Sequence, residues 1–232
     1  MNIPKSIKNP IIIQGFPGVG LVGSIAIEYL IEHLKCEFIA QHYFEDLSAT
    51  IAIHNGNIIY PVNVYYNKEY NFLLLHAVIA NSKLEWKMAN IINDLVKQTG
   101  AKEVICLEGV ATMEPQNTPQ VFYYTTNPKK QQVLDKISSR LTEGIVVGVT
   151  PALLLKRTCN ITAFFADTAT GLPDSKAAAK LIEAIDKYLN LKVDPKPLLK
   201  QAEKFEQKLK GILEQGAKVQ ENMKNRQLSY VG

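Results

Sequence analysis

A glycine-rich pattern, G-x-G-x-x-G, directly follows the apolar run 11–13, and its glycines are Gly18, Gly20 and Gly23. In nucleotide-binding folds, glycines at this spacing let a pyrophosphate approach the backbone amides at a helix N-terminus. Glu45 and Asp46 lie about twenty residues further on, at the spacing where a carboxylate binds the ribose in such folds. The pattern therefore permits a nucleotide or dinucleotide site.

Two features favour a structural interpretation of the glycines. Pro17 stiffens the loop and removes one amide donor. Asn55-Gly56 lies between two β-rich runs and predicts a type I′ hairpin, at a position where a dinucleotide fold would carry a crossover helix. We therefore interpret the four glycines, Gly15 included, as the turn that packs the first helix on the first strand, and we expect no bound cofactor.

Other polar residues follow predicted strands and could do acid–base or nucleophilic chemistry: His76, Glu108, Glu114, Asp167 and Thr168. Loops at the carboxyl ends of strands are the usual ligand sites of open α/β sheets. No local Ser-His-Asp or Cys-His signature accompanies these residues. Carboxylates here can instead cap backbone amides, and His76 can be a strand-end residue. We expect no catalytic residues.

The cysteines and histidines do not show the spacing of a metal site. Cys36, Cys106 and Cys159 lack a C-x-x-C pattern, and the four histidines lack local zinc-site spacing. We expect the cysteines to be small apolar side chains beside strands, and we expect no metal.

Apolar runs of strand length alternate along residues 1–193 with amphipathic stretches of helical period. The alternation predicts a three-layer α/β sandwich with a mixed central sheet and an inserted hairpin region at 49–60. We expect strands at 11–13, 37–43, 62–66, 72–77, 103–107, 121–125, 144–149 and 158–165. We expect helices at 21–34, 82–99, 152–157 and 177–191, a short helix between 127 and 141, and loops at 108–115 and 167–174. Ser82 and Thr150 are the expected N-caps, Glu85 would complete a capping box with Ser82, and Gly100 would end the helix 82–99.

Residues 194–226 carry small and apolar side chains at alternating spacings of four and three, which is a heptad seam. This pattern predicts a C-terminal helical arm that packs either on another subunit or on its own domain. The seam residues are Leu198, Ala202, Phe205, Leu209, Ile212, Gly216, Val219 and Met223. The peptide 227–232 is either flexible or a docking peptide. Its partner-binding residues would be Leu228, Tyr230, Val231 and Gly232.

The formal charge of +4 is uneven along the chain. Up to Pro195 there are 18 basic and 18 acidic side chains, whereas from Lys196 onward there are eight and four. No basic stripe interleaved with aromatic residues appears, so we expect no nucleic-acid partner. Without a bilayer-length apolar run or a signal-peptide pattern, we expect no membrane partner and a cytoplasmic location.

Several segments together resemble the archaeal branch of the proteasome-assembly-chaperone family. They are 15–23, Glu108-Gly109-Val110, 148–155, and Pro173-Asp174 followed by Ala177-Ala178. The resemblance implies a fold similar to purine nucleoside phosphorylases and peptidyl-tRNA hydrolases. It also implies homo-oligomers, such as tetramers or pentamers, and a role in assembling proteasome α-subunits without ATP.

In similar archaeal proteins, a C-terminal hydrophobic residue, a tyrosine and the final residue dock between α-subunits. Here Tyr230 is third from the end and follows Ser229, which departs from that pattern. Some relatives are labelled predicted ATP-grasp proteins, but the sequence shows neither an acidic metal cluster nor a lysine-bearing glycine loop. We therefore expect a non-catalytic assembly chaperone. A nucleotide-binding enzyme, or a nucleosidase- or hydrolase-like enzyme, is the alternative.

Overall fold

The computed structural model of the protein describes residues 1, 3–46, 49–54, 56–78, 84–111, 118–168, 173–193, 197 and 199–200. All the predicted heptad positions and the peptide 227–232 lie outside the described residues, as do Ser82 and Glu114. No helix within the described ranges is long and apolar enough to cross a membrane.

The core of the molecule is a mixed eight-stranded sheet in the order β2-β5-β6-β1-β7-β10-β8-β9. Its central strands β6, β1, β7 and β10 are parallel, and β5 and β8 run antiparallel to them. The strands are β1 (Ile11–Gly15), β2 (Glu37–His42), β5 (Val62–Asn67), β6 (Phe72–Ala77), β7 (Glu103–Ala111), β8 (Val121–Thr125), β9 (Ser139–Arg140) and β10 (Asn160–Thr168).

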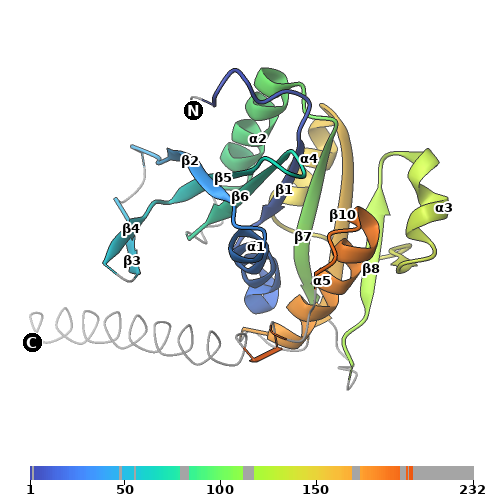
Figure 1. The fold of residues 1–232 in the computed structure, drawn as a ribbon. Helices are drawn as coiled ribbons and strands as arrows, with labels where there is room; N and C mark the ends of the chain where they lie inside the picture. Colours follow the sequence, from blue (N-terminus) through green and yellow to red (C-terminus); the bar gives the residue numbers. More distant parts are fainter. Residues whose placement is uncertain are drawn as a thin grey trace, which may run out of the picture.

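Helices cover both faces of this sheet (Figure 1). The helices α1 (Val22–His33) and α5 (Ser175–Leu189) pack on one face, and α2 (Glu85–Thr99) and α4 (Val149–Lys156) pack on the other. Successive strand residues point to opposite faces, so Ile13 joins the α1/α5 core and Ile12 the α2/α4 core, both fully buried. The predicted three-layer α/β sandwich with a mixed sheet is confirmed.

The described part of the chain also forms three short helical segments and a small second sheet. They are η1 (Val19–Leu21), η2 (Pro128–Lys130), α3 (Gln131–Leu134), and the pair β3 (Ala52–His54) and β4 (Asn57–Ile59). The strands β3 and β4 pair antiparallel across Gly56, whose φ of 76° lies in the region that glycine favours. The predicted hairpin is confirmed, and it projects from the edge of the molecule (Figure 1). Asn55 lies outside the described residues.

Local chemistry fixes two helix boundaries, the end of α2, which was predicted, and the start of α5, which lies at Ser175 rather than at the predicted 177. Gly100, with φ 69°, ends α2, and its backbone N–H donates to the carbonyl of Val96. At the start of α5, Asp174 Oδ1 accepts from the backbone N–H of Ala177 at 2.9 Å.

The prediction of a strand at 144–149 is wrong. Residues 144–148 form a loop in which Ile145 is 90% and Val147 is 79% exposed. Gly144 and Gly148 have φ values of 155° and 127°, so the backbone leaves the extended conformation at both ends of the apolar run. The N-cap of α4 is therefore Gly148, and Thr150 lies inside the helix rather than capping it.

Two other predicted segments are also corrected. The strand predicted at 103–107 continues to Ala111, because β10 runs beside it as far as Thr168 and supplies backbone partners. Glu108 and Gly109 are therefore strand residues and not loop residues. The helix predicted between 127 and 141 ends at Leu134, and β9 follows it beside β8.

Candidate functional site

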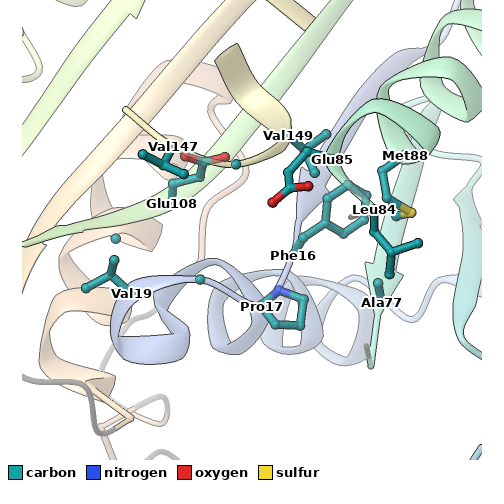
Figure 2. A pocket seen from close by; sticks show the side chains of 13 residues that line it. Phe16, Pro17, Val19, Ala77, Leu84, Glu85, Met88, Glu108, Val147 and Val149 are labelled. Atoms are coloured by element: carbon teal, nitrogen blue, oxygen red, sulfur yellow. The ribbon is translucent and has the colours of Figure 1, made fainter. Parts of the chain in front are cut away.

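A cavity of about 380 Å³ lies at the carboxyl ends of β1, β6 and β7, on the α2/α4 side of the sheet. This is the edge of the sheet where ligand sites of open α/β folds occur. Figure 2 shows its side chains. The lining residues are Phe16, Pro17, Gly18, Val19, Ala77, Leu84, Glu85, Met88, Glu108, Gly109, Val147, Gly148 and Val149.

The glycines beside this cavity allow three backbone segments to touch. A Cβ on Gly15 would overlap the carbonyl oxygen of Gly23, and a Cβ on Gly23 would overlap the carbonyl oxygen of Leu107. A Cβ on Gly109 would likewise overlap the carbonyl oxygen of Val19. These contacts bring β1, the start of α1 and β7 into direct backbone contact, which agrees with the packing interpretation of the glycines.

Gly20 connects the same loop to β10 and α5. Its φ is 62°, and a Cβ there would lie 2.9 Å from the Thr168 hydroxyl oxygen. Its carbonyl accepts from the backbone N–H of Asp174 at 2.8 Å, and Thr168 donates its hydroxyl to Asp174 Oδ2 at 2.8 Å. Gly18 differs from its neighbours, because it lines the cavity and a Cβ there would meet only the Phe16 carbonyl oxygen, at 3.9 Å.

Glu108 is the polar centre of the cavity. The Thr150 hydroxyl donates to Glu108 Oε1 at 2.5 Å, and Gln14 Nε2 donates to the Thr150 hydroxyl oxygen at 3.4 Å. Gln14 and Thr150 are fully buried, and Gln14 Oε1 has no hydrogen-bond partner within the described part of the chain. Burial raises the pKa of Glu108 from 4.5 to about 7, against the opposing effect of the hydrogen bonds from Thr150. Glu108 is therefore a carboxyl group that ionises near neutral pH.

We expect Glu108→Gln to stabilise the protein at pH 8 by about 3 kcal/mol, because each pKa unit corresponds to ~1.36 kcal/mol. The folded state holds this proton more tightly than the unfolded state does. Stability therefore falls as the pH rises from 4.5 to about 7, and the whole penalty is present above pH 7. Urea unfolding of the variant and the parent at pH 4 and pH 8 measures the difference. A stability difference that is the same at both pH values would contradict this account.

Of the other candidate catalytic residues, the structure describes His76, Asp167 and Thr168, and none of these three lines the cavity. His76 follows Phe72 and Leu74 on the α1/α5 face of β6, opposite to Glu108, and burial lowers its pKa to about 4. Asp167 accepts a hydrogen bond from the backbone N–H of Gln120, and Thr168 is engaged with Asp174. This placement agrees with the expectation that the carboxylates bind backbone amides and that His76 is a strand-end residue.

The acidic residues proposed for a ribose lie elsewhere too. Asp46 forms an ion pair with Lys87, and the Lys87 hydrogen bond lowers the pKa of its carboxyl group. Neither Glu45 nor Asp46 lines the cavity with Gly18. Within the described ranges, no group of three His, Cys, Asp or Glu residues could hold a metal ion.

Three residues of the site were not identified from the sequence. Thr150 was expected to cap a helix, and Glu85 to complete a capping box with Ser82, so both had a local explanation. Gln14 gave one signal, since it is a polar residue at the end of a buried apolar run. All three lie on the α2/α4 side of the sheet with Glu108.

A family model and a related protein both match this chain over most of its length. A sequence model described as the PAC2 family matches residues 12–213. An uncharacterised protein of Methanocaldococcus jannaschii is 28% identical over 229 residues, which cover 97% of this chain and 94% of the relative. The match to the family model therefore covers nearly all of the α/β domain and continues to residue 213 in the segment that follows it.

Solved structures extend the comparison to the fold. PbaA of Pyrococcus furiosus, described as an archaeal homolog of proteasome-assembly chaperone, is 28% identical, with a TM-score of 0.81 over 90% of this chain and 94% of that chain. PbaB of the same organism, described as an archaeal proteasome activator, has a TM-score of 0.76 at 24% identity, over 91% of this chain and 96% of that chain. The similarity to PbaB is one of fold.

Proposed function

Because the chain belongs to the PAC2 family, we propose that it is a non-catalytic, ATP-independent assembly chaperone that binds proteasome α-subunits and promotes their assembly. The observation that carries this proposal is the similarity to PbaA, a homolog of proteasome-assembly chaperone, over nearly the full length of both chains. Neither the family match nor this similarity is confined to one motif.

Exposed apolar side chains support a role in protein–protein contact. The loop before α4 and the end of α4 expose Ile145, Val147 and Leu155, the last at 73%. The hairpin region exposes Ile51, Ile53 and Ile58 at 53%, 71% and 53%. Groups of large exposed apolar side chains mark protein–protein contact sites, whereas single exposed apolar residues are normal on protein surfaces. Self-association into a homo-oligomer, and contact with α-subunits, would both cover such groups.

The chemistry of the titratable groups supports a non-catalytic role. Burial raises the pKa of the Cys106 thiol to about 12, so this sulfur is a neutral thiol at physiological pH and a poor nucleophile. The partners of Glu108 are a threonine hydroxyl and, through it, an amide, and neither is an activated nucleophile. His76, the one histidine among the strand-end candidates, lies on the other face of the sheet.

A nucleotide-binding enzyme receives less support. Gly18 lines the cavity, but so do the carboxyl groups of Glu85 and Glu108, and no lysine or arginine is among the described lining residues. A phosphate placed there would face negative charge without a compensating cation.

The C-terminal segments have a place in this proposal. The heptad seam 198–223 would pack between subunits or on its own domain, and Leu228, Tyr230, Val231 and Gly232 would dock on α-subunits. We expect the full-length protein to bind recombinant proteasome α-subunits of the same organism, and to speed their assembly, in the absence of ATP. Native mass spectrometry and size-exclusion chromatography measure both the complex and the oligomeric state.

Truncation and point variants separate the contributions of the tail. Removing 195–232 is expected to weaken α-subunit binding or to change the oligomeric state, and Tyr230→Ala is expected to weaken binding alone. Tyr43→Ala, at a tyrosine that is 57% exposed on the α/β domain, is the matched control and should leave binding unchanged. A full-length protein that neither binds α-subunits nor alters their assembly would overturn the proposal.

A further inference from the structure

The cavity combines an apolar wall with two carboxyl groups. Phe16, Leu84 and Met88 form one side, and each is less than 10% exposed. In the view of Figure 2, the carboxyl group of Glu85 lies between these side chains and Glu108. The described lining residues include no lysine, arginine or histidine.

We propose that this cavity binds a small alkylammonium ligand, with the ammonium group at Glu108 and Glu85 and the alkyl stem against Phe16, Leu84 and Met88. The proposal is independent of the chaperone role. A volume of about 380 Å³ lies within the range of small-molecule sites, about 300–1,000 Å³.

The lining selects the ligand by charge. A cation is attracted by both carboxyl groups, while an anion of the same length is repelled by them. A charge removed from water is costly unless it has a partner. An ammonium group supplies that partner, because its positive charge and its three N–H donors match the negative charge and the acceptor oxygens of the carboxylates. Thr150 donates its hydroxyl to Oε1 of Glu108, and a carboxylate has about four acceptor positions, so the group can accept from a ligand as well.

Two hydrogen bonds in series hold the Glu108 carboxyl group in place. Thr150 on α4 donates to it, and Gln14 on β1 donates to Thr150. Both supporting side chains are fully buried in the described structure, so neither is free to move into solvent. The acceptor is therefore positioned before a ligand arrives, which reduces the ordering cost of binding.

Binding should depend on pH through Glu108. Among the described residues, the groups that face Glu108 are Glu85 from α2, the uncharged Cys106 thiol from β7, and Gln14 and Thr150, which do not ionise. Because the pKa of Glu108 is about 7, its carboxyl group is mostly neutral at pH 6 and mostly ionised at pH 8. An alkylamine remains protonated at both values, since its pKa is about 10. Its affinity should therefore be roughly tenfold higher at pH 8 than at pH 6.

Isothermal titration of the full-length protein with n-pentylamine, n-pentanol and pentanoate at pH 8 tests the proposal. We expect saturable binding of the amine, at least tenfold weaker binding of the alcohol, and no binding of the carboxylate. An alcohol that binds as tightly as the amine, or no binding of the amine at all, would overturn the proposal. Because these comparisons use the parent protein, they test the proposal even if a variant fails to fold.

A matched pair of variants locates the site. Glu108→Gln keeps an oxygen that can accept from Thr150, and it should weaken pentylamine binding at least tenfold and abolish the difference between pH 6 and pH 8. Glu69→Gln removes the same charge from the exposed turn between β5 and β6, at the opposite end of β6, and should change neither. Equal affinities for Glu108→Gln and the parent at pH 8 would contradict the assignment.

Discussion

Alanine at position 23 is expected to prevent stable folding. The added Cβ would overlap the carbonyl oxygen of Leu107 and would lie 3.2 Å from that of Phe16, and both obstacles are backbone atoms. Overpacking in a core costs about 1–3 kcal/mol where side chains can yield, and more where they cannot. A typical domain has only about 5–15 kcal/mol of stability in total. Soluble yield, circular dichroism and thermal unfolding measure the effect.

Gly18→Ala is the matched control within the same motif. Its backbone is extended, with φ −155°, and a Cβ there meets nothing closer than 3.9 Å. We expect this variant to fold with a stability close to that of the parent. If alanine were tolerated at 23 but not at 18, the glycines would be required for the close approach of a bound ligand rather than for backbone packing.

Glu103→Ala should destabilise the protein by about 3 kcal/mol, at the lower end of the range for breaking a buried ion pair. Glu103 is 2% exposed at the start of β7 and accepts from three groups. Lys130 Nζ lies 2.5 Å from Oε2, while the Thr162 and Tyr188 hydroxyls donate to Oε1 at 2.5 and 2.9 Å. Removal of the carboxylate breaks these three bonds and leaves the Tyr188 hydroxyl without its acceptor, whereas Lys130 keeps the Tyr188 hydroxyl oxygen at 2.6 Å and the Thr162 hydroxyl keeps that of Thr125 at 3.1 Å. The partly exposed Lys130 can regain water, which limits the loss.

Urea unfolding at neutral pH measures this loss, with Glu183→Ala as the control. Glu183 pairs with Lys180 one turn away on α5, and both side chains are about one-third exposed. Such a surface pair contributes about 0.2–0.5 kcal/mol. A Glu103 variant no less stable than the Glu183 variant would show that the network around β7 adds nothing to stability.

Local signals in the sequence predicted much of the fold. The apolar run before the glycines became β1, and the residues after them became α1, because strand and helix periods are both visible in short windows. Asn55-Gly56 predicted a hairpin and Gly100 predicted the end of a helix, since both depend on backbone conformations that few residues adopt.

The errors came from information that lies elsewhere in the chain. An apolar β-branched run such as 144–149 has the composition of a strand, but it becomes one only if a neighbouring strand supplies hydrogen bonds. The length of β7 is set in the same way by β10, about sixty residues later. The sequence contains these partners, but no local pattern shows which segments will meet.

The candidate site was predicted only in part for a related reason. Glu108 was identified because it follows an apolar run, which is a local property. Its supporting residues Gln14 and Thr150 lie on β1 and α4, at separations from Glu108 that no motif spans. Thr150 and Glu85 also had plausible capping roles, so the pattern gave no reason to place them around a cavity.

The backbone contacts of the glycine loop also affect the order in which the domain can form. Gly23 lies against Leu107, and Gly20 lies against Thr168, so the segment around β1 reaches its final packing only when residues far along the chain have arrived. During synthesis, β1 and α1 must therefore wait for β7 and β10 before the loop can close. Contacts of such large sequence separation slow folding and leave apolar segments exposed in the meantime. A protein proposed to assist the assembly of others thus has a long interval of incomplete packing in its own biogenesis.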